Sequence, residues 1–354
     1  MNKRLFALLT AVITFTVGVA IASLSLSKLL RNPKQSVKIE IQLANNYRLS
    51  GPYEFKNLTM FLVHGPDEPG SLVYTTLQDA MQRGVVAVHE TETVNELAIE
   101  NTSANEDVFV QAGDLVKGGK QDRVLSVDLI LPSKSGKIPI SAFCVEPSRW
   151  QPRFEEYADQ FTITEMSAGF SLRRAIKDTA SQVGVWNEVE ASQQKIMTSV
   201  SDEVRSALYP SSLPLALENE SVQKSVQPYV NHFSPIVEQS NDVRGVVFTI
   251  NNELIGGDVY ASNVMFKRLW PRLLKGAAIE AVAELPMKLD NEGVAIETVK
   301  SFLVNSERGA EMIDDVTART HVMRREIEKS LFFETRDMDN DGAWIHRSYL
   351  TKKQ

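Results

Sequence analysis

The chain has 354 residues, of which 43% are hydrophobic and 23% are charged, and its formal net charge is −7. Residues 1–34 contain five basic and no acidic residues, so the other 320 carry a net charge of −12, which makes nucleic acid and anionic lipid surfaces poor partners for them. That length can bury a sizeable core, and the single cysteine excludes an intrachain disulfide.

The N-terminus is a hydrophobic segment behind a short basic start. Residues 5–27 contain no charge, and a helix over residues 5–26 would be roughly 33 Å long, which spans a bilayer. We therefore expect residues 1–34 to be a signal anchor with a short linker and residues 35–354 to be the folded domain. Small residues at Ala20 and Ala22 also fit a cleavable signal peptide.

The charges beside this segment bear on its orientation. A short basic start such as Lys3 and Arg4 usually stays inside, so we expect an extracytoplasmic domain anchored in the membrane through residues 5–26. Cleavage near Ala22 would instead give a secreted or periplasmic protein. A cytoplasmic domain is favoured by the more numerous basic residues beyond the segment, which are Lys28, Arg31, Lys34 and Lys38.

Residues 37–150 have the patterns of a β-rich half. Alternating apolar and polar residues begin at Val37, which marks the start of folded structure. The pattern predicts a short helix at 76–83 and strands at 37–43, 58–64, 85–90, 97–100 and 107–111.

Two longer apolar runs in this half flank a turn. Residues 124–131 and 138–146 lie on either side of the turn-prone residues 133–136, which predicts a β-hairpin. With the other strands, this indicates a sandwich or an open barrel of mostly antiparallel strands.

Residues 151–354 mix helices with further hairpins. The pattern predicts helices at 171–200, at 220–228 with Pro228 as the stop, at 262–284 with a kink at Pro271, and at 294–304. It predicts strands at 245–250 and 253–259 joined by Asn251 and Asn252, and strands at 321–325, 331–336 and 344–350. The predicted fold is α+β, with an antiparallel β-rich N-terminal half followed by helices and further β-hairpins, behind an N-terminal hydrophobic helix.

The segment before the predicted hairpin is the candidate ligand site. Positive charge, an amide and glycine backbone N–H groups together suit a phosphate or carboxylate, and Arg149 with Trp150 could stack a planar group. The alternative is a structural ion network in which Lys120 and Arg123 pair with Asp122 and Glu146. The candidate ligand-binding residues are Gly118, Gly119, Lys120, Gln121, Arg123, Glu146, Arg149 and Trp150.

Cys144 and Glu146 are the candidate catalytic residues, since they lie on one face of a predicted strand, about 7 Å apart. Cys144 would act as a nucleophile or Glu146 as a general base. The alternative is that Cys144 is a small buried hydrophobe with an inert thiol.

A metal site is not predicted. Asp337, Asp339, Asp341 and Gly342 match the first half of a calcium loop, but Ser348 replaces the required glutamate, which favours an acidic hairpin turn. The histidines lack metal-ligand spacing. The sequence identifies no cofactor.

Two motifs resemble a known family. The first is Gly-x-Lys-Gln-x-Arg at 118–123 and the second is Cys-Val-Glu-x-x-Arg-Trp at 144–150, with further likeness at 245–252, 255–259 and 269–273. In these the chain resembles the ARPP-1 family, named for association with ADP-ribosylglycohydrolase and rhodanese-phosphatase proteins. The resemblance covers most of residues 53–350 and implies a nucleotide- or ADP-ribose-like ligand, but no established reaction.

We therefore expect a membrane-anchored or secreted binding module for a small anionic ligand. One alternative is a hydrolase or transferase acting on a nucleotide-sugar-like substrate. Another is a structural envelope protein without catalytic activity. Protein partners are not indicated by the sequence.

Overall fold

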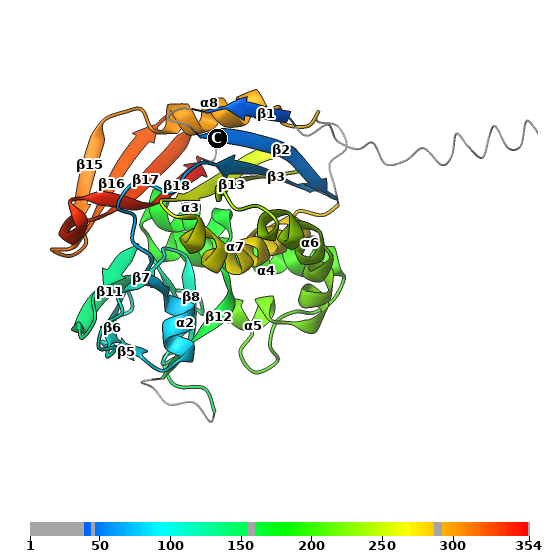
Figure 1. The fold of residues 1–354 in the computed structure, drawn as a ribbon. Helices are drawn as coiled ribbons and strands as arrows, with labels where there is room; N and C mark the ends of the chain where they lie inside the picture. Colours follow the sequence, from blue (N-terminus) through cyan, green and yellow to red (C-terminus); the bar gives the residue numbers. More distant parts are fainter. Residues whose placement is uncertain (1–38, 44–46, 155–159, 287–291, 353–354) are drawn as a thin grey trace, which may run out of the picture. The chain divides into compact units, whose positions relative to one another are not determined.

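The computed structural model describes residues 39–43, 47–154, 160–286 and 292–352. Among them, nine strands form one antiparallel sheet built from both ends of this part of the chain (Figure 1). In spatial order they are β1 (Ile39–Gln42), β2 (Arg48–Phe55), β3 (Leu58–His64), β13 (Val243–Ile250), β14 (Glu253–Tyr260), β18 (Ala343–Thr351), β17 (Ser330–Asp337), β16 (Thr320–Ile327) and β15 (Glu311–Asp315).

The inner strands of this large sheet are buried on both faces. In β3, Met60 and Leu62 point into a core shared with helix α7 (Asn263–Ala283), whereas Phe61 and Val63 point into a core shared with helix α8 (Ile296–Ser306). Successive strand residues face opposite sides, so a strand covered on both sides needs a continuous apolar run. This is why the run at 58–64 was recognisable in the sequence.

Residues between β3 and α3 form two smaller sheets. Six strands pair in the order β12 (Phe161–Ser167), β8 (Asp114–Gly118), β9 (Arg123–Leu125), β11 (Gly136–Cys144), β6 (Glu96–Asn101) and β5 (Val86–Glu90) in the described chain. A second sheet contains β10 (Leu129–Leu131), β7 (Val108–Val110) and β4 (Thr75–Thr76), and helix α2 (Leu77–Gln82) packs beside them.

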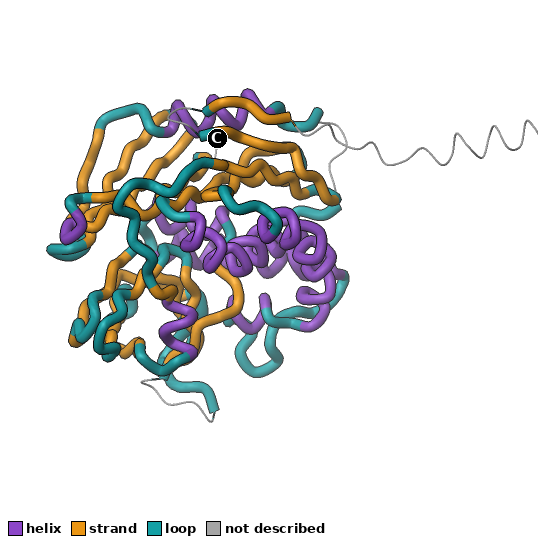
Figure 2. Tube along the Cα trace, viewed as in Figure 1, coloured by secondary structure: helices purple, strands orange, loops and turns teal. Residues whose placement is uncertain are grey.

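Most helices lie on one face of the large sheet, where α3 and α7 contact β13, β14 and β18, while α8 covers the opposite face (Figure 2). The helices on the first side are α3 (Phe170–Thr179), α4 (Gln182–Val200), α5 (Leu213–Leu217), α6 (Glu220–Glu238) and α7. The α+β class and the antiparallel sheets of the N-terminal half are therefore confirmed. However, β1–β3 belong to the large sheet, where β3 pairs with β13, and not to the sheets formed by the other strands of that half.

The predicted pairing of 124–131 with 138–146 is wrong in part. The first run divides into β9, which pairs with β11, and β10, which pairs with β7 in another sheet. Between them lies Asp128, whose buried carboxylate accepts hydrogen bonds from Ala112 N (2.7 Å) and Thr335 Oγ1 (2.5 Å). A buried carboxylate requires such partners, and Asp128 has them at the point where the chain passes from one sheet to the other.

Two helix predictions also need correction. The helix expected over 171–200 divides at Ala180, which has a φ of 44°, and Ser181 then caps α4. Pro228 does not end α6, which continues to Glu238. A proline inside a helix costs about 3 kcal/mol, whereas burial of Phe233 and Val237 beyond it gives roughly 1.5–3 kcal/mol each.

The predicted hydrophobic helix at 5–26 lies outside the described residues. Of the helices that the structure does describe, none is long and apolar enough to cross a membrane.

Candidate functional site

The predicted loop begins with a tight turn at two glycines. Gly118 and Gly119 have φ values of 127° and 51°, and a Cβ on Gly118 would lie 2.4 Å from the carbonyl oxygen of Gln160. The N–H of Gly118 donates to Asp122 Oδ1 (2.9 Å), and the carbonyl oxygens of both glycines accept hydrogen bonds from Arg149 (3.1 and 2.8 Å). The turn thus presents carbonyl oxygens to a cation, and the Gly118 N–H already has an acceptor within the protein.

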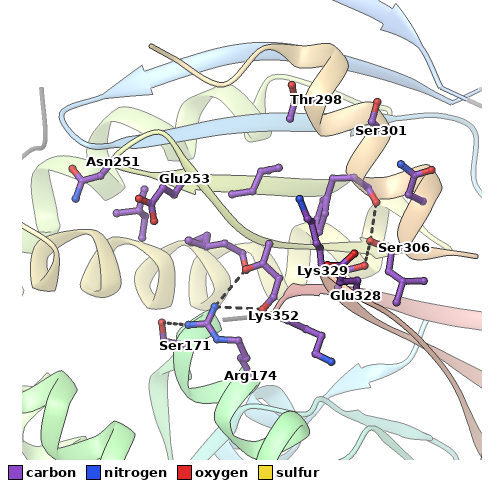
Figure 3. Close-up of a pocket in the computed structure, with 18 of the residues that line it drawn as sticks. Ser171, Arg174, Asn251, Glu253, Thr298, Ser301, Ser306, Glu328, Lys329 and Lys352 are labelled. Atoms are coloured by element: carbon purple, nitrogen blue, oxygen red, sulfur yellow. Dashed lines mark hydrogen bonds between the residues drawn. The ribbon is translucent and has the colours of Figure 1, made fainter. Parts of the chain in front are cut away.

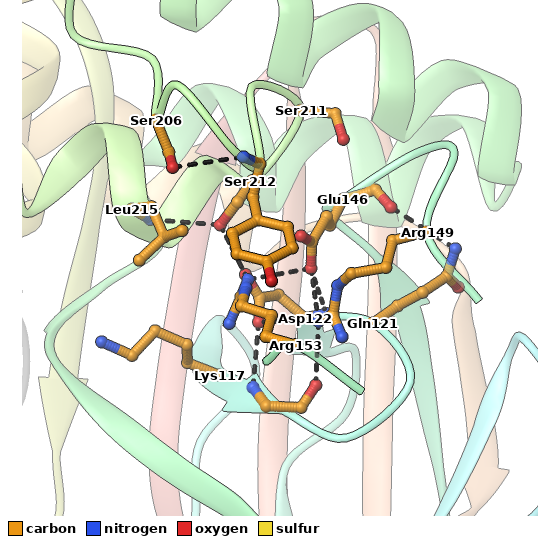
Figure 4. Close-up of polar contacts among 12 residues, drawn as sticks. Lys117, Gln121, Asp122, Glu146, Arg149, Arg153, Ser206, Ser211, Ser212 and Leu215 are labelled. Atoms are coloured by element: carbon orange, nitrogen blue, oxygen red, sulfur yellow. Dashed lines mark hydrogen bonds and ion pairs between the residues drawn. The ribbon is translucent and has the colours of Figure 1, made fainter. Parts of the chain in front are cut away.

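Two carboxylates and two arginines meet behind this turn (Figure 4). Glu146 Oε2 accepts hydrogen bonds from Arg149 Nη2 (2.5 Å), Arg153 Nη2 (2.9 Å) and the backbone N–H of Asp122 (3.1 Å). Asp122 Oδ2 accepts hydrogen bonds from Arg153 and from Ser212 Oγ (2.6 Å). We refer to Asp122, Glu146, Arg149, Arg153 and Ser212 as the buried ion network.

The buried ion network is enclosed by protein, since all five of its side chains are buried. Burial raises the pKa of Glu146, although the hydrogen bond from Arg149 acts in the opposite direction. Ser212 also caps helix α5, so the network ties the loop to that helix. Breaking such a pair leaves an uncompensated buried charge, at a typical cost of 3–5 kcal/mol. The sequence suggested Lys120 and Arg123 as the cations of such a network, whereas the structure places Arg149 and Arg153 there.

Arg123 lies outside the buried ion network. Its side chain is fully buried, its Nε donates to the carbonyl oxygen of Val94 (3.0 Å), and its Nη2 is 3.8 Å from Glu90 Oε2. Neither terminal nitrogen has a hydrogen-bond acceptor among the described residues. Burial lowers the pKa of Arg123, because the nearby negative groups do not fully offset the cost of burying its positive charge. The expected partner Glu146 is replaced by Glu90.

The remaining residues of the predicted site cover Arg123. The guanidinium carbon of Arg123 is 5.8 Å from the ring centroid of Trp150, and Lys120 Nζ is 5.3 Å from it. Lys120 also pairs with Glu92, and Gln121 Nε2 donates to the carbonyl oxygen of Glu146 (3.4 Å). Trp150 is 42% exposed. The structure therefore brings the predicted site residues together beneath a partly exposed tryptophan.

Cys144 is a cross-strand neighbour of Arg123 and is fully buried. Its Sγ accepts a hydrogen bond from the backbone N–H of Glu146 (3.3 Å), and burial raises the pKa of the thiol despite that bond and the nearby Arg123 charge. A nucleophilic cysteine requires an accessible thiolate with a lowered pKa. The geometry favours the inert-thiol interpretation.

A second buried chain of charges was not recognised in the sequence. His346 lies between two carboxylates, with Nδ1 2.7 Å from Asp128 Oδ2 and Nε2 3.0 Å from Asp258 Oδ1. Arg173 binds Asp258 through both terminal nitrogens. Burial alone would lower the pKa of His346, but the two carboxylates raise it to about 9. No spacing rule relates these four positions, so only the fold could place them together.

The acidic turn at 337–342 joins β17 to β18. Asp337 binds Arg319 and accepts a hydrogen bond from Tyr74 Oη (2.7 Å). Burial alone would raise the pKa of Asp337, but these two partners outweigh it and lower the pKa. Across the described part of the chain, no group of three or more His, Cys, Asp or Glu side chains is placed to hold a metal ion.

A cleft of about 1080 Å³, which we call the α3–α8 cleft, lies elsewhere (Figure 3). It is bordered by the start of α3, by α7 and α8, and by the ends of β14, β16 and β18. Its polar lining includes Ser171, Arg174, Lys195, Asn251, Glu253, Glu280, Glu284, Thr298, Ser301, Asn305, Arg308, Glu328, Lys329 and Lys352.

Arg174 differs from Lys195 and Lys352 of the α3–α8 cleft in having no carboxylate partner among the described residues. It donates to Ser171 Oγ (3.2 Å) and makes long contacts of 3.4 Å with the carbonyl oxygen and Oγ1 of Thr351. No carboxylate of the described residues lies within 4.0 Å of its guanidinium nitrogens. In contrast, Lys195 pairs with Glu284 and Lys352 pairs with Glu326. Arg174 therefore retains capacity to bind an anion.

Glu280 holds the start of helix α3 at the border of the cleft. Its carboxylate accepts hydrogen bonds from the backbone N–H groups of Phe170 (2.7 Å) and Ser171 (3.0 Å) and from the Ser171 hydroxyl, and so caps helix α3. Burial raises the pKa of Glu280, against the effect of these bonds. Neither Arg174 nor Glu280 was recognisable from the sequence, because the cleft residues come from distant positions.

The comparisons with known proteins agree with the two motifs. A family model described as the ARG and Rhodanese-Phosphatase-superfamily-associated Protein domain, ARPP-1, matches residues 46–350. Neither a search of curated proteins nor a search of solved structures found a match. Because the matched region covers most of the chain, this protein belongs to the ARPP-1 family.

Proposed function

We propose that this chain is a binding module for a small anionic, nucleotide- or ADP-ribose-like ligand, and that the ligand binds in the α3–α8 cleft. The observation that supports this most directly is Arg174, whose guanidinium lines the cleft without a carboxylate partner among the described residues. The cleft, at about 1080 Å³, has the size of a pocket that encloses a whole small molecule.

The lining fits such a ligand chemically. Arg308 and Lys329 line the same cleft as Arg174 and add positive charge to it. Thr298, Ser301 and Asn305 supply hydroxyl and amide groups for a sugar. A planar guanidinium binds phosphate or carboxylate through two parallel hydrogen bonds, which fixes the orientation of the anion.

The test is a thermal-shift screen of the full chain with ADP-ribose, AMP, sugar phosphates and dicarboxylates. We expect a ligand that raises the melting temperature of wild type. Arg174→Ala should weaken its binding by about 10- to 100-fold, the value of a hydrogen bond to a charged group. The melting temperature of the mutant alone should change little.

Arg83→Ala is the matched control, since Arg83 is exposed, is paired with Glu106 and does not line the cleft. It should keep the full ligand-induced shift. If Arg174→Ala bound the ligand as tightly as Arg83→Ala, the cleft would not be the site.

The predicted loop is a second candidate for the same ligand class. It is favoured by the two terminal nitrogens of Arg123, which lack acceptors, and by the exposed Trp150 beside Lys120. A ligand there would have to displace Trp150 to reach Arg123. The hydrolase or transferase alternative would require Cys144 or Glu146 to become accessible. Under the structural envelope alternative, neither the α3–α8 cleft nor the predicted loop would bind a ligand.

Localisation completes the proposal. The uncharged segment at 5–26 is long enough to anchor the domain in a membrane, with the domain on the extracytoplasmic side. The alternatives are cleavage near Ala22 and a cytoplasmic domain. Protease digestion and cell fractionation would distinguish these three locations. An anchored extracytoplasmic domain should be digested while the inner membrane is still closed, and it should be found in the membrane fraction.

A further inference from the structure

Lys177 stands in the last turn of α3, between two hollows that are separate from the α3–α8 cleft. The outer hollow has a volume of about 300 Å³ and the inner one about 20 Å³, and both are lined by Lys177, Ile176, Val322 and Phe333. The Nζ of Lys177 is 4.7 Å from the ring centroid of Phe333. The amine thus lies against an aromatic ring and borders a space large enough for a small molecule.

The charged groups near Lys177, apart from Asp314, are engaged elsewhere. In the inner hollow, Asp128 bonds to His346 and Thr335, and Arg173 binds Asp258. In the outer hollow, Arg324 binds Glu326 and Asp314 is in an exposed strand. No carboxylate in the described chain lies within 4.0 Å of Lys177 Nζ.

This environment disfavours the ammonium form. Burial lowers the pKa of Lys177 to about 8, with Asp128 and Asp314 opposing the effect and Arg173 and Arg324 adding to it. At pH 7.4 a group with such a pKa is roughly one-fifth free amine, whereas an ordinary lysine is about one-thousandth free amine. The contact with Phe333 favours the ammonium, so the two effects compete.

We propose that Lys177 is a nucleophilic amine that forms an imine with a small carbonyl compound entering the outer hollow. The lone pair of Nζ attacks the carbonyl carbon and forms a C–N bond. The resulting carbinolamine loses water, which carries away the carbonyl oxygen and two protons, and a C=N bond remains. No oxidant or reductant is needed.

The outer hollow favours a carbonyl compound that also bears a carboxylate. Arg324 lines it, and its Nε has no hydrogen-bond acceptor among the described residues. The hydroxyl-bearing residues Ser126 and Ser141 lie in the same wall. A small α-keto acid or aldehyde acid could therefore place its carboxylate against Arg324 and its carbonyl against Lys177.

The test uses glyoxylate as the probe and sodium cyanoborohydride to trap the imine as a carboxymethyl amine. After brief treatment of the full chain at pH 7.5, peptide mass mapping should show Lys177 modified at least about ten times faster than the exposed Lys137. The rate at Lys177 should reach half its maximum near pH 8, and the rate at Lys137 should keep rising to higher pH. Equal rates at the two lysines would overturn the proposal.

Two variants and a second probe complete the experiment. Lys177→Arg keeps the positive charge and should remove the fast-reacting site. Arg324→Gln should slow the reaction with glyoxylate several-fold and leave the reaction with acetaldehyde unchanged. If Arg324→Gln reacted with glyoxylate as fast as wild type does, the role assigned to Arg324 would be wrong. Wild-type rates alone decide the reactivity of Lys177, so a poorly folded variant does not affect that result.

Discussion

Arg173 and Asp258 form a two-bond ion pair in the interior, with Nη1 2.8 Å from Oδ2 and Nη2 2.6 Å from Oδ1. Asp258 lies on β14 of the large sheet and Arg173 on α3, while His346 on β18 links Asp258 to Asp128 in the segment between β9 and β10. One chain of alternating charges therefore connects the large sheet, a helix and the smaller sheets.

The first prediction concerns this pair. Arg173→Met should lower the free energy of unfolding by about 3–5 kcal/mol, because it leaves Asp258 buried with only part of its compensation. Urea unfolding measures the loss. The control is Lys224→Met, which removes an exposed pair with Glu220 and should lower the stability far less. Similar losses in the two variants would contradict the assignment.

The second prediction is a pH dependence due to His346. Its pKa is about 9 in the folded protein against an ordinary value of 6.5, so the folded state holds a proton that the unfolded state releases. The stabilisation is full below about pH 6.5 and is lost as the pH rises through 9, with a decrease of about 1–2 kcal/mol between pH 6.5 and 8.

His346→Asn should lack this decrease, although it should be less stable at every pH in the range. The comparison stops at pH 8 because Lys177, with a pKa lowered to about 8, acts in the opposite sense above that value. A wild-type stability that stayed constant or rose between pH 6.5 and 8, relative to the variant, would show that His346 is neutral.

The third prediction separates Arg123 from the buried ion network. Arg149→Met should cost about 3–5 kcal/mol, because it removes a cation bound to Glu146 at 2.5 Å. Arg123→Met should cost less than about 1.5 kcal/mol, since Arg123 makes one hydrogen bond and a long contact of 3.8 Å with Glu90. Unfolding curves of the two variants provide the matched comparison, and equal costs would assign Arg123 to the network.

The fourth prediction concerns the thiol of Cys144. Alkylation by iodoacetamide at pH 7.5 should be at least about 100-fold slower in the native protein than in denaturant, because the thiol is buried and its pKa is raised. Labelling is followed by mass spectrometry. Rapid labelling of the native protein, with a midpoint well below the pKa of a free thiol, would instead support the enzyme alternative.

The fifth prediction concerns the N-terminal segment. A variant lacking residues 1–34 should be soluble and should unfold cooperatively, because the described fold, from β1 at Ile39 onward, lies beyond residue 34 and the deleted segment is expected to form a separate anchor. Circular dichroism and sedimentation would test this. An insoluble or unfolded product would mean that the segment belongs to the core.

The local sequence was sufficient where one stretch of chain carries its own signal. The hairpin of β13 and β14 was predicted from two apolar runs around Asn251 and Asn252, and both asparagines have positive φ values of 51° and 63°. The family was likewise recognisable from two short motifs. These features depend on neighbouring residues, which the sequence displays directly.

The same motifs predicted that Lys120, Arg123, Glu146 and Arg149 gather in space, but not which charges pair. That outcome depended on Arg153 and Ser212, which reach Asp122 from outside the motifs. Buried charges pair with whichever groups the packing brings within about 3 Å, and sequence separation does not determine those distances.

Apolar periodicity and turn residues thus determined the α+β class and most individual strands, and the resemblance of two short motifs pointed to the family. Only the tertiary structure decided that the run at 124–131 divides at Asp128, that α6 passes Pro228, and that the α3–α8 cleft joins Arg174 to residues near 300 and 350. The physical reason is that strand pairing and charge compensation join residues far apart in the chain. Their energies therefore depend on the assembled fold and not on the local pattern.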